Sequence, residues 1–408
     1  MTIEIARRPL RVDRLQLPER ADQIGMSVGE AERAFEIFAD GQQLLNLTYA
    51  DTKRYPPPSW VVPDFVRAAE GGAEAYTPYR GSRIVRADVA DSITRFLGIA
   101  IDPDTDLALT PGTQAGLFGA VSALVEEGDR VALLDPEYLS TERMLRFCGA
   151  EVVHVALELT PQGPVVDLDA LESAARAGLR LLVLSHPNNP TGAVYDDATV
   201  RRIGEIALAH DVVVLVDQLY SRLVYDGRPF HHLTALPGMR ERTITLLGPS
   251  KTEQMSGFRV GCVVAPPEVL NRIEDVQSIT AIRAPAYAQH ILRRWLREDT
   301  EFLEQRIEEY QAVRDMAYER LSALDMVEIH RAQGTSYMFP SVKALGRSDQ
   351  DVARILLEQA RVIVNPGYQF GPRGVGSFRI CFAQEESVWS VTLDRIADTL
   401  TGIAEGRL

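Results

Sequence analysis

Between about residue 60 and residue 285, short apolar runs alternate with longer stretches of amphipathic character. Stretches such as Asp197–His210 have helical spacing. Five strand-like runs of four to six residues are apolar on both faces: Arg130–Leu134, Leu181–Leu184, Val212–Val216, Thr243–Leu247 and Val260–Ala265. Such strands alternating with helices predict an α/β fold, with a mostly parallel sheet and helices on both faces.

The pattern changes after about residue 286. A long charged amphipathic helix is predicted from Tyr287 to about Leu324, with room for a bend. Short strands are predicted at Ser336–Phe339, Val362–Val364 and Phe378–Ala383, with helices between and after them. This mixture indicates a smaller α+β domain.

The N-terminal part is less regular. Ser27 and Glu30 form a capping-box pattern that opens a helix through about Phe38, and a proline-rich break follows at residues 56–58. We therefore predict an N-terminal segment, 1–55, that belongs to the small domain. A large domain over 56–285 and a C-terminal small domain over 286–408 complete the organisation.

Lys251 is the most unusual residue in the large domain. It follows the apolar run Thr243–Leu247 in a Gly-Pro-Ser-Lys-Thr segment, a setting that packing explains poorly. A buried amine loses its proton easily and can form a Schiff base with a carbonyl. Ser250 precedes it, and Arg259 follows in a second glycine-rich segment.

Other polar residues follow the predicted strands, where ligands of parallel sheets bind. Gly112, Thr113 and Gln114 open a small-residue helical stretch whose backbone amides suit a phosphate, although the segment taken alone favours a simple loop with a helix cap. Tyr138 ends another run, and its ring can stack on a flat ligand or serve as a half-buried structural side chain.

The segment Pro187–Gly192 fixes a turn that aims the Asn189 amide into the same region, or forms an ordinary Asx turn. Asp217 ends an apolar strand, where a carboxylate needs a cation or several donors; capping a helix is the alternative. Tyr220 lies three residues later. Arg379 stands inside an apolar strand, where it needs an anion, either a ligand or a structural partner.

Taken together, these groups match one ligand. A phosphate would meet Gly112 and Arg259 with their neighbours, a ring would lie against Tyr138, and a ring nitrogen would meet Asp217. A phenolic oxygen would meet Asn189 and Tyr220, an imine would join Lys251, and a substrate carboxylate would meet Arg379. Pyridoxal 5'-phosphate has all the cofactor groups in this set.

With these residues in place, the chain from about Leu44 to its end resembles the class I/II aminotransferases, the fold-type I pyridoxal-phosphate enzymes related to aspartate aminotransferase. The matching motifs are Asn-Pro-Thr-Gly at Asn189–Gly192, Asp-x-x-Tyr at Asp217–Tyr220, Ser-Lys-x7-Arg at Ser250–Arg259, and Arg379. The resemblance implies amino-group transfer between an amino acid and a 2-keto acid through a Lys251 aldimine.

The resemblance also assigns roles to individual residues. It implies that Asp217 pairs with the pyridinium, that Arg379 and Asn189 bind substrate, and that the enzyme is a homodimer. Tyr76 would reach the phosphate of the neighbouring subunit, and Arg283 would serve the neighbour's site by binding the distal carboxylate of an acidic donor. A surface or interface role explains Arg283 equally well.

Three positions depart from the family's usual pattern. Gln218 stands where a glutamate is common, Gly248 where a phosphate-binding hydroxyl is common, and Ala50 where a glycine often borders the substrate. The first two leave cofactor binding intact. Ala50 leaves the substrate and the reaction open, so elimination, replacement or cyclisation on the same scaffold is the main alternative.

Net charge, motifs and cysteine spacing narrow the classes of function that remain. A net charge of −14 argues against nucleic acid and against a basic membrane-binding face. It also disfavours a non-catalytic regulatory module fused to a DNA-binding head. A nucleotide-binding enzyme using Gly112 lacks the expected glycine motif. Three scattered cysteines suit neither a zinc site nor a disulfide framework. We expect a cytoplasmic protein with no membrane span and no metal.

Overall fold

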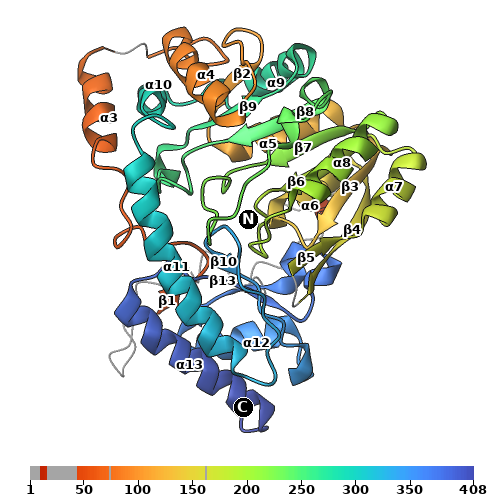
Figure 1. Cartoon of the computed structure of the whole chain (residues 1–408), viewed down its shortest axis with the longest axis vertical. Coiled ribbons are helices and arrows are strands. Elements are labelled where there is room, and N and C mark those ends of the chain that lie inside the picture. The colour runs from red at the N-terminus through yellow and green to blue at the C-terminus, as the bar shows by residue number, and fades with distance from the viewer. Residues whose placement is uncertain (1–9, 16–43, 73–74, 161–162) are drawn as a thin grey trace, which may run out of the picture.

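The computed structural model describes residues 10–15, 44–72, 75–160 and 163–408. Its centre is an eight-stranded sheet of order β2-β9-β8-β7-β6-β3-β4-β5 (Figure 1). The strands are β2 (Leu107–Thr110), β3 (Arg130–Asp135), β4 (Glu151–Thr160), β5 (Gly163–Val166), β6 (Leu181–Ser185), β7 (Val213–Asp217), β8 (Thr243–Leu247) and β9 (Gly261–Val264). Strands β4, β3, β6, β7 and β8 pair in parallel, whereas β9 is antiparallel to both β8 and β2. The predicted mostly parallel sheet is confirmed.

The five strands predicted from the sequence agree with β3, β6, β7, β8 and β9 to within one residue at each end. The sequence pattern did not single out β2, β4 and β5. Strands β4 and β5 form an antiparallel edge of the sheet. Because β4 exposes Glu151 and Glu158 and β5 contains Pro164, neither strand has the continuous apolar run of a buried strand.

Helices cover both faces of the sheet, as predicted. Alternate residues of β6 divide between two cores: Leu182 packs with helices α7 and α8, and Leu181 packs with α5 and α9. The bounds are α4 (Arg83–Leu97), α5 (Thr113–Leu124), α6 (Leu139–Cys148), α7 (Leu168–Arg176), α8 (Asp197–Ala209) and α9 (Pro267–Ile279). Helix α4 covers β2 and β9 on the α7–α8 side. The short α1 (Leu10–Asp13) lies against α6.

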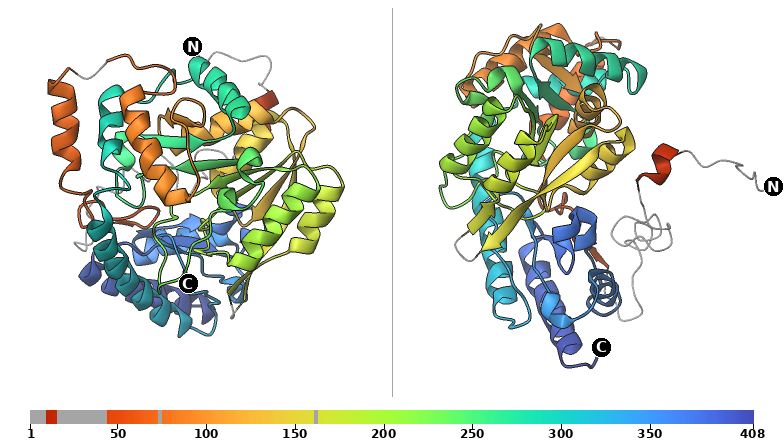
Figure 2. Two further views of the ribbon diagram at one scale, coloured as in Figure 1. Left: turned by 45° about the horizontal axis from the view of Figure 1, so that its top comes forward. Right: turned by 90° about the vertical axis from the view of Figure 1, so that its right-hand side faces the viewer.

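The C-terminal elements gather at the other end of the molecule, coloured blue in Figures 1 and 2. They are α11 (Thr300–Ser322), β10 (Tyr337–Met338), α12 (Asp349–Ile355), β11 (Val362–Ile363), β12 (Asn365–Pro366), β13 (Phe378–Cys381) and α13 (Glu386–Ala404). Strand β1 (Leu45–Asn46) pairs in parallel with β11, and Leu47 and Tyr55 lie in the same core as Phe378. Residues 44–55 thus pack with the C-terminal part, while the exact domain boundaries stay a prediction.

The helix predicted from Tyr287 to Leu324 is not continuous. The chain forms α10 (Ala286–Gln289) and a 3-10 turn, η5 (His290–Arg293), and then breaks at Leu296, where φ is 65°, before α11 begins. A buried ion pair explains the break: Arg222 donates hydrogen bonds of 2.9 and 2.8 Å to Asp299, which also accepts one from the Leu296 backbone. The helix predicted from Ser27 to Phe38 lies outside the described residues, and the first large-domain helix is α3 (Val61–Glu70).

Candidate active site

A cavity of about 350 Å³ opens at the carboxyl ends of the central strands and is closed on its far side by β12, β13 and the turn after β1. Strands β3, β6, β7 and β8 run parallel, so the residues that follow them meet at one edge of the sheet. The lining includes the predicted residues Thr113, Gln114, Tyr138, Asn189, Asp217, Tyr220, Ser250, Lys251, Arg259 and Arg379.

Lys251 and Asp217 define the middle of the cavity. Asp217 is the last residue of β7, and Lys251 lies in the turn after β8, the next strand in the sheet. Burial raises the pKa of Asp217 to about 6, while the Leu219 backbone amide, which donates to Oδ1 at 3.1 Å, and the Lys251 amine oppose the rise. No helix follows Asp217, so the capping alternative is wrong and the carboxylate is available to a cation.

One end of the cavity carries groups suited to an anion. Gly112 precedes α5, with φ of 76° and ψ of 160°, and the Arg259 guanidinium lies so close that a side chain at Gly112 would collide with it. The Ser250 hydroxyl is buried and has no hydrogen-bond partner within the described residues. An unpartnered buried hydroxyl costs free energy unless a ligand meets it.

The walls of the cavity are aromatic and amide groups. The Tyr138 hydroxyl donates to Gln114 Oε1 at 3.2 Å, which fixes the Tyr138 ring at the entrance of α5. Tyr220 is buried against Tyr337, with ring centroids 5.8 Å apart, and its hydroxyl has no hydrogen-bond partner in the described part of the chain. Burial raises the pKa of Tyr220 well above its usual value, so the hydroxyl stays a donor at neutral pH.

Arg379 closes the cavity from β13. It donates to Asn189 Oδ1 at 2.9 Å, to Asn365 Oδ1 at 2.6 Å and to the Thr48 carbonyl oxygen at 3.2 Å. Its guanidinium also lies over the Tyr337 ring, 4.0 Å from the centroid. These contacts hold the guanidinium in place, and its buried Nε has no partner among the described residues. No carboxylate pairs with Arg379 in the part of the chain described, so the structural ion pair considered as an alternative is not formed.

The charges in the cavity have one dominant sign. Among the described lining residues, Lys251, Arg259 and Arg379 are cationic and Asp217 is anionic, which gives a local charge of +2 on a chain of net charge −14. Such a cavity attracts small anions although the whole protein repels them.

Three predicted site residues lie elsewhere. Ala50 is buried in the core of the C-terminal part, and Thr48, two residues earlier, lines the cavity instead. Tyr76 is 83% exposed and stacks on Arg283, whose guanidinium carbon lies 4.9 Å from its ring centroid. Arg283 donates to the Thr77 carbonyl oxygen at 2.9 Å, so both residues belong to one surface cluster of this chain.

The two other departures from the family pattern have local explanations. A side chain at Gly248 would press against the Gly261 backbone and the Thr113 side chain, each about 3.3 Å from its Cβ, so glycine lets two glycine-rich turns approach. Gln218 points away from the cavity, and its Oε1 lies 3.0 Å from His232 Nδ1.

Sequence reasoning missed several lining residues, including Ser185, Tyr337 and Asn365. Asn365 is paired in register with Arg379 across β12 and β13, a neighbourhood that no local pattern reveals. Ser185 was visible as the polar residue that ends an apolar strand, which is the signal that identified Asp217. Tyr337 gave no signal.

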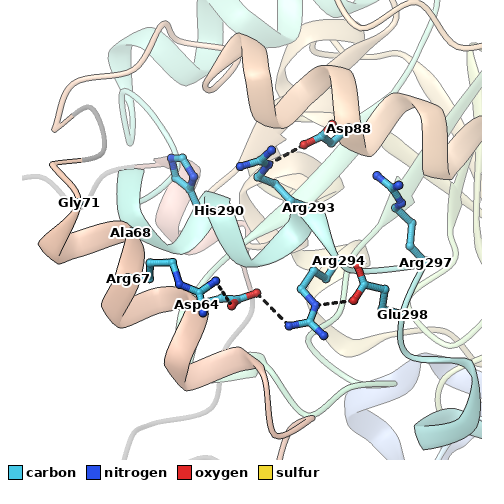
Figure 3. A pocket seen from close by; sticks show the side chains of 10 residues that line it. All are labelled: Asp64, Arg67, Ala68, Gly71, Asp88, His290, Arg293, Arg294, Arg297 and Glu298. Atoms are coloured by element: carbon cyan, nitrogen blue, oxygen red, sulfur yellow. Dashed lines mark hydrogen bonds and ion pairs between the residues drawn. The ribbon is translucent and has the colours of Figure 1, made fainter.

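A second hollow lies away from this cavity, between α3, α4 and η5 (Figure 3). It is lined by arginines and carboxylates that pair with one another: Arg293 with Asp88 at 2.5 Å, and Arg294 with Glu298 at 2.8 Å and Asp64 at 3.6 Å. These ion pairs neutralise most of the charges that line the hollow, so the chemistry is better supported at the sheet edge.

The comparisons with known proteins agree with this site. The family model for aminotransferase class I and II matches residues 44–396, and the chain therefore belongs to that family. A probable aspartate/prephenate aminotransferase of Thermus aquaticus is 32% identical over 371 residues, covering 90% of this chain and 94% of the relative. Aromatic-amino-acid aminotransferase 2 of Thermococcus litoralis is 27% identical over 393 residues, covering 95% and 98%.

A solved structure extends the match to three dimensions. The crystal structure of an aspartate aminotransferase from Rhodobacter sphaeroides aligns with a TM-score of 0.86 and 34% identity, covering 88% of this chain and 92% of that one. The predicted fold and enzyme class are confirmed: the protein is an aminotransferase of this family.

Within the described ranges no helix is long and apolar enough to cross a membrane, and no cluster of metal-ligating side chains occurs. The cytoplasmic location stays a prediction.

Proposed function

We propose that this aminotransferase uses pyridoxal 5'-phosphate bound in the cavity at the carboxyl ends of the sheet, with Lys251 as its covalent anchor. One observation carries the proposal. A single cavity contains the Lys251 amine, the Asp217 carboxylate and three buried polar groups without partners among the described residues, on Ser250, Tyr220 and Arg379.

The residues present fit the proposed cofactor group by group. Ser250, Arg259 and the backbone amides at the start of α5 would hold the phosphate, because a helix N-terminus and a guanidinium both favour anions. Tyr138 would lie against the ring. The Asn189 oxygen already accepts from Arg379, so its NH₂ group remains to donate, with the Tyr220 hydroxyl, to a phenolic oxygen.

The reaction roles follow from these positions. When bound, the cofactor supplies an electron-withdrawing ring that weakens the α-C–H bond of an attached amino acid. Asp217, as a carboxylate, would keep the ring nitrogen protonated. Lys251 Nζ would take the proton from the substrate α-carbon and deliver it to the cofactor side, acting as general base and then acid. Arg379 would hold the substrate carboxylate, which fixes the α-carbon relative to Lys251.

The products follow from nitrogen balance. The amino acid donor loses its amino group and leaves as a 2-keto acid, and a second 2-keto acid accepts that group and leaves as an amino acid. The cavity's positive charge suits both, because each substrate carries at least one carboxylate.

We also propose a homodimer in which Tyr76 and Arg283 serve the partner's site. Their placement supports this: Tyr76 is exposed and held against Arg283, and the buried Arg283 Nε has no partner among the described residues. An arginine offered across the interface would favour a donor with a distal carboxylate. The names of two relatives, an aspartate/prephenate aminotransferase and an aromatic-amino-acid aminotransferase, suggest aspartate and aromatic amino acids as the donors to test.

The decisive experiment is a visible spectrum of the purified protein with cofactor while amino acids are added one at a time. We expect the absorption band of the lysine-bound cofactor to be replaced by the band of its amino form. One molecule of 2-keto acid should be formed for each molecule of cofactor. Release of ammonia or of a rearranged product without the amino form would instead indicate elimination, replacement or cyclisation. Protein that takes up no cofactor would contradict the whole proposal.

A further inference from the structure

Glu137 is a buried carboxylate that the reaction described above does not use. It follows β3, is 2% exposed, and stands directly before Tyr138 but does not line the cavity. No ion pair reaches it from any described residue. A buried carboxylate without a cation is costly unless several hydrogen-bond donors meet it.

Four donors do meet it. Glu137 Oε1 accepts from the Tyr138 backbone amide at 2.7 Å and from the Ser185 hydroxyl at 2.5 Å. Oε2 accepts from the Ser185 backbone amide at 2.8 Å and from Asn188 Nδ2 at 3.3 Å. Both oxygens therefore accept two hydrogen bonds, an arrangement that fits the ionised carboxylate.

The Ser185 hydroxyl extends this network toward the cavity. Its oxygen accepts from the Asn189 backbone amide at 3.0 Å and from Asn188 Nδ2 at 3.3 Å, so its own hydrogen is directed to Glu137. Glu137 thus holds Tyr138 directly and Asn189 through Ser185. These two residues stand on separate walls of the cavity and come from separate loops, after β3 and after β6.

We propose that Glu137 is a positioning residue that sets Tyr138 and Asn189 relative to each other and so fixes the tilt of the cofactor ring between them. The inference rests on the proposed cofactor site. Burial raises the pKa of Glu137 to about 8, and the donors from Ser185 and Tyr138 oppose that rise, so the ionised form that accepts all four hydrogen bonds predominates above about pH 8.

Two variants test the proposal. Glu137→Gln keeps the shape of the side chain but replaces one oxygen with an NH₂ group. That group cannot accept the two hydrogen bonds made at its position, so the loop on one side of the cavity would lose its anchor. Ser185→Ala removes the hydroxyl that links Glu137 to Asn189, together with its contact to Asn188, and leaves the Tyr138 backbone hydrogen bond in place. The probe is pyridoxal 5'-phosphate, and the readouts are its dissociation constant, the visible circular dichroism of the bound ring, and the split between kcat and KM.

We expect Glu137→Gln to weaken cofactor binding about tenfold or more and to change the visible circular dichroism. The Ser185→Ala variant should produce part of the same change, and the double variant should lose less than the product of the two single effects, because both act through one network. Asp349→Asn is the matched control. It alters another buried carboxylate that accepts a backbone amide, that of Tyr368, and should leave cofactor affinity and circular dichroism unchanged.

Wild-type affinity and circular dichroism in Glu137→Gln, or independent effects in the double variant, would overturn the proposal. If Glu137→Gln does not fold, Ser185→Ala carries the test alone, and an unchanged spectrum there would overturn the relay to Asn189. The wild type separates this inference from the proposed function: wild-type protein that binds no cofactor contradicts the function, whereas normal binding with unaffected variants contradicts the role of Glu137 alone.

Discussion

Arg379 Nη1 donates a 2.9 Å hydrogen bond to the side-chain oxygen of Asn189. The group proposed for the substrate carboxylate and the group proposed for the cofactor oxygen are therefore in direct contact, although they come from opposite sides of the cavity. Any carboxylate that binds Arg379 will act on the Asn189 amide as well, so substrate binding is coupled to the cofactor's surroundings.

We predict that turnover depends most directly on Lys251. We expect Lys251→Ala to keep its fold and to bind the cofactor without covalent attachment, with transamination reduced by about 10⁴-fold or more because the acid–base group is lost. Circular dichroism in the far ultraviolet and a coupled keto-acid assay measure the two effects. Lys343→Ala, which removes an exposed lysine outside the cavity, should retain full activity. Substantial transamination by Lys251→Ala would refute the assignment.

Asp217 gives the site a pH dependence with a defined sign. Its carboxyl has a pKa of about 6 in the free protein, and pairing with a protonated ring nitrogen requires the ionised form. Cofactor affinity should therefore be full above about pH 6 and fall as the pH drops below it. Asp217→Ala should bind the cofactor more weakly, turn over more slowly and lose this pH step. Fluorescence titrations between pH 5 and pH 8 test it, and an unchanged rate in Asp217→Ala would contradict the pairing.

Gly112 is expected to tolerate no side chain. Its ψ of 160° at a φ of 76° is a conformation open to glycine, and a Cβ would displace the Arg259 guanidinium. Gly112→Ala should weaken cofactor binding by about tenfold or more. Gly98→Ala is the control, since Gly98 has a φ of 73° but open space around it. Equal cofactor affinity in the two variants would show that the Gly112 turn does not shape the phosphate site.

We predict that Arg283 makes the enzyme favour acidic donors. If it serves the partner's site, Arg283→Ala should lower kcat/KM for acidic donors by about tenfold or more and leave neutral donors nearly unchanged. Arg297→Ala removes an exposed arginine elsewhere and serves as the control. A donor panel measures the difference, and an equal loss for acidic and neutral donors counts against a distal-carboxylate role.

His154 on β4 should make stability depend on pH. It lies 3.2 Å from Asp135 and 3.5 Å from Glu142, and hydrogen bonds to these carboxylates raise its pKa to about 9. Because the folded pKa is higher than that of the unfolded chain, the contribution is full below about pH 6.5 and is lost as the pH rises through about 9.

The corresponding variant is His154→Gln. It should be less stable than wild type by about 2 kcal/mol at pH 6 and nearly equal at pH 9.5, as urea unfolding would measure. A gap of the same size at both pH values would mean that packing, rather than charge, explains the effect of the substitution.

Local sequence patterns were enough to predict one side of the site. Asp217 and Lys251 each follow an apolar strand, and parallel strands bring their carboxyl ends to one edge, so strand recognition alone brings these residues together. The other side depends on how distant segments pack. Asn365 lines the cavity beside Arg379, its partner across the β12–β13 pairing, and Ala50 packs in the C-terminal core a few residues after β1 pairs with β11. Neither pairing has a signal in a short stretch of sequence.

The contact between Arg379 and the Thr48 carbonyl joins positions 331 residues apart. During synthesis Thr48 is made long before the arginine that meets it. The loops after β6, β7 and β8 can assemble before Arg379 has been made, whereas its contact with Thr48 cannot form until then. A chain truncated before β13 would therefore keep Lys251 and lack the Arg379–Thr48 contact that closes the far side of the cavity.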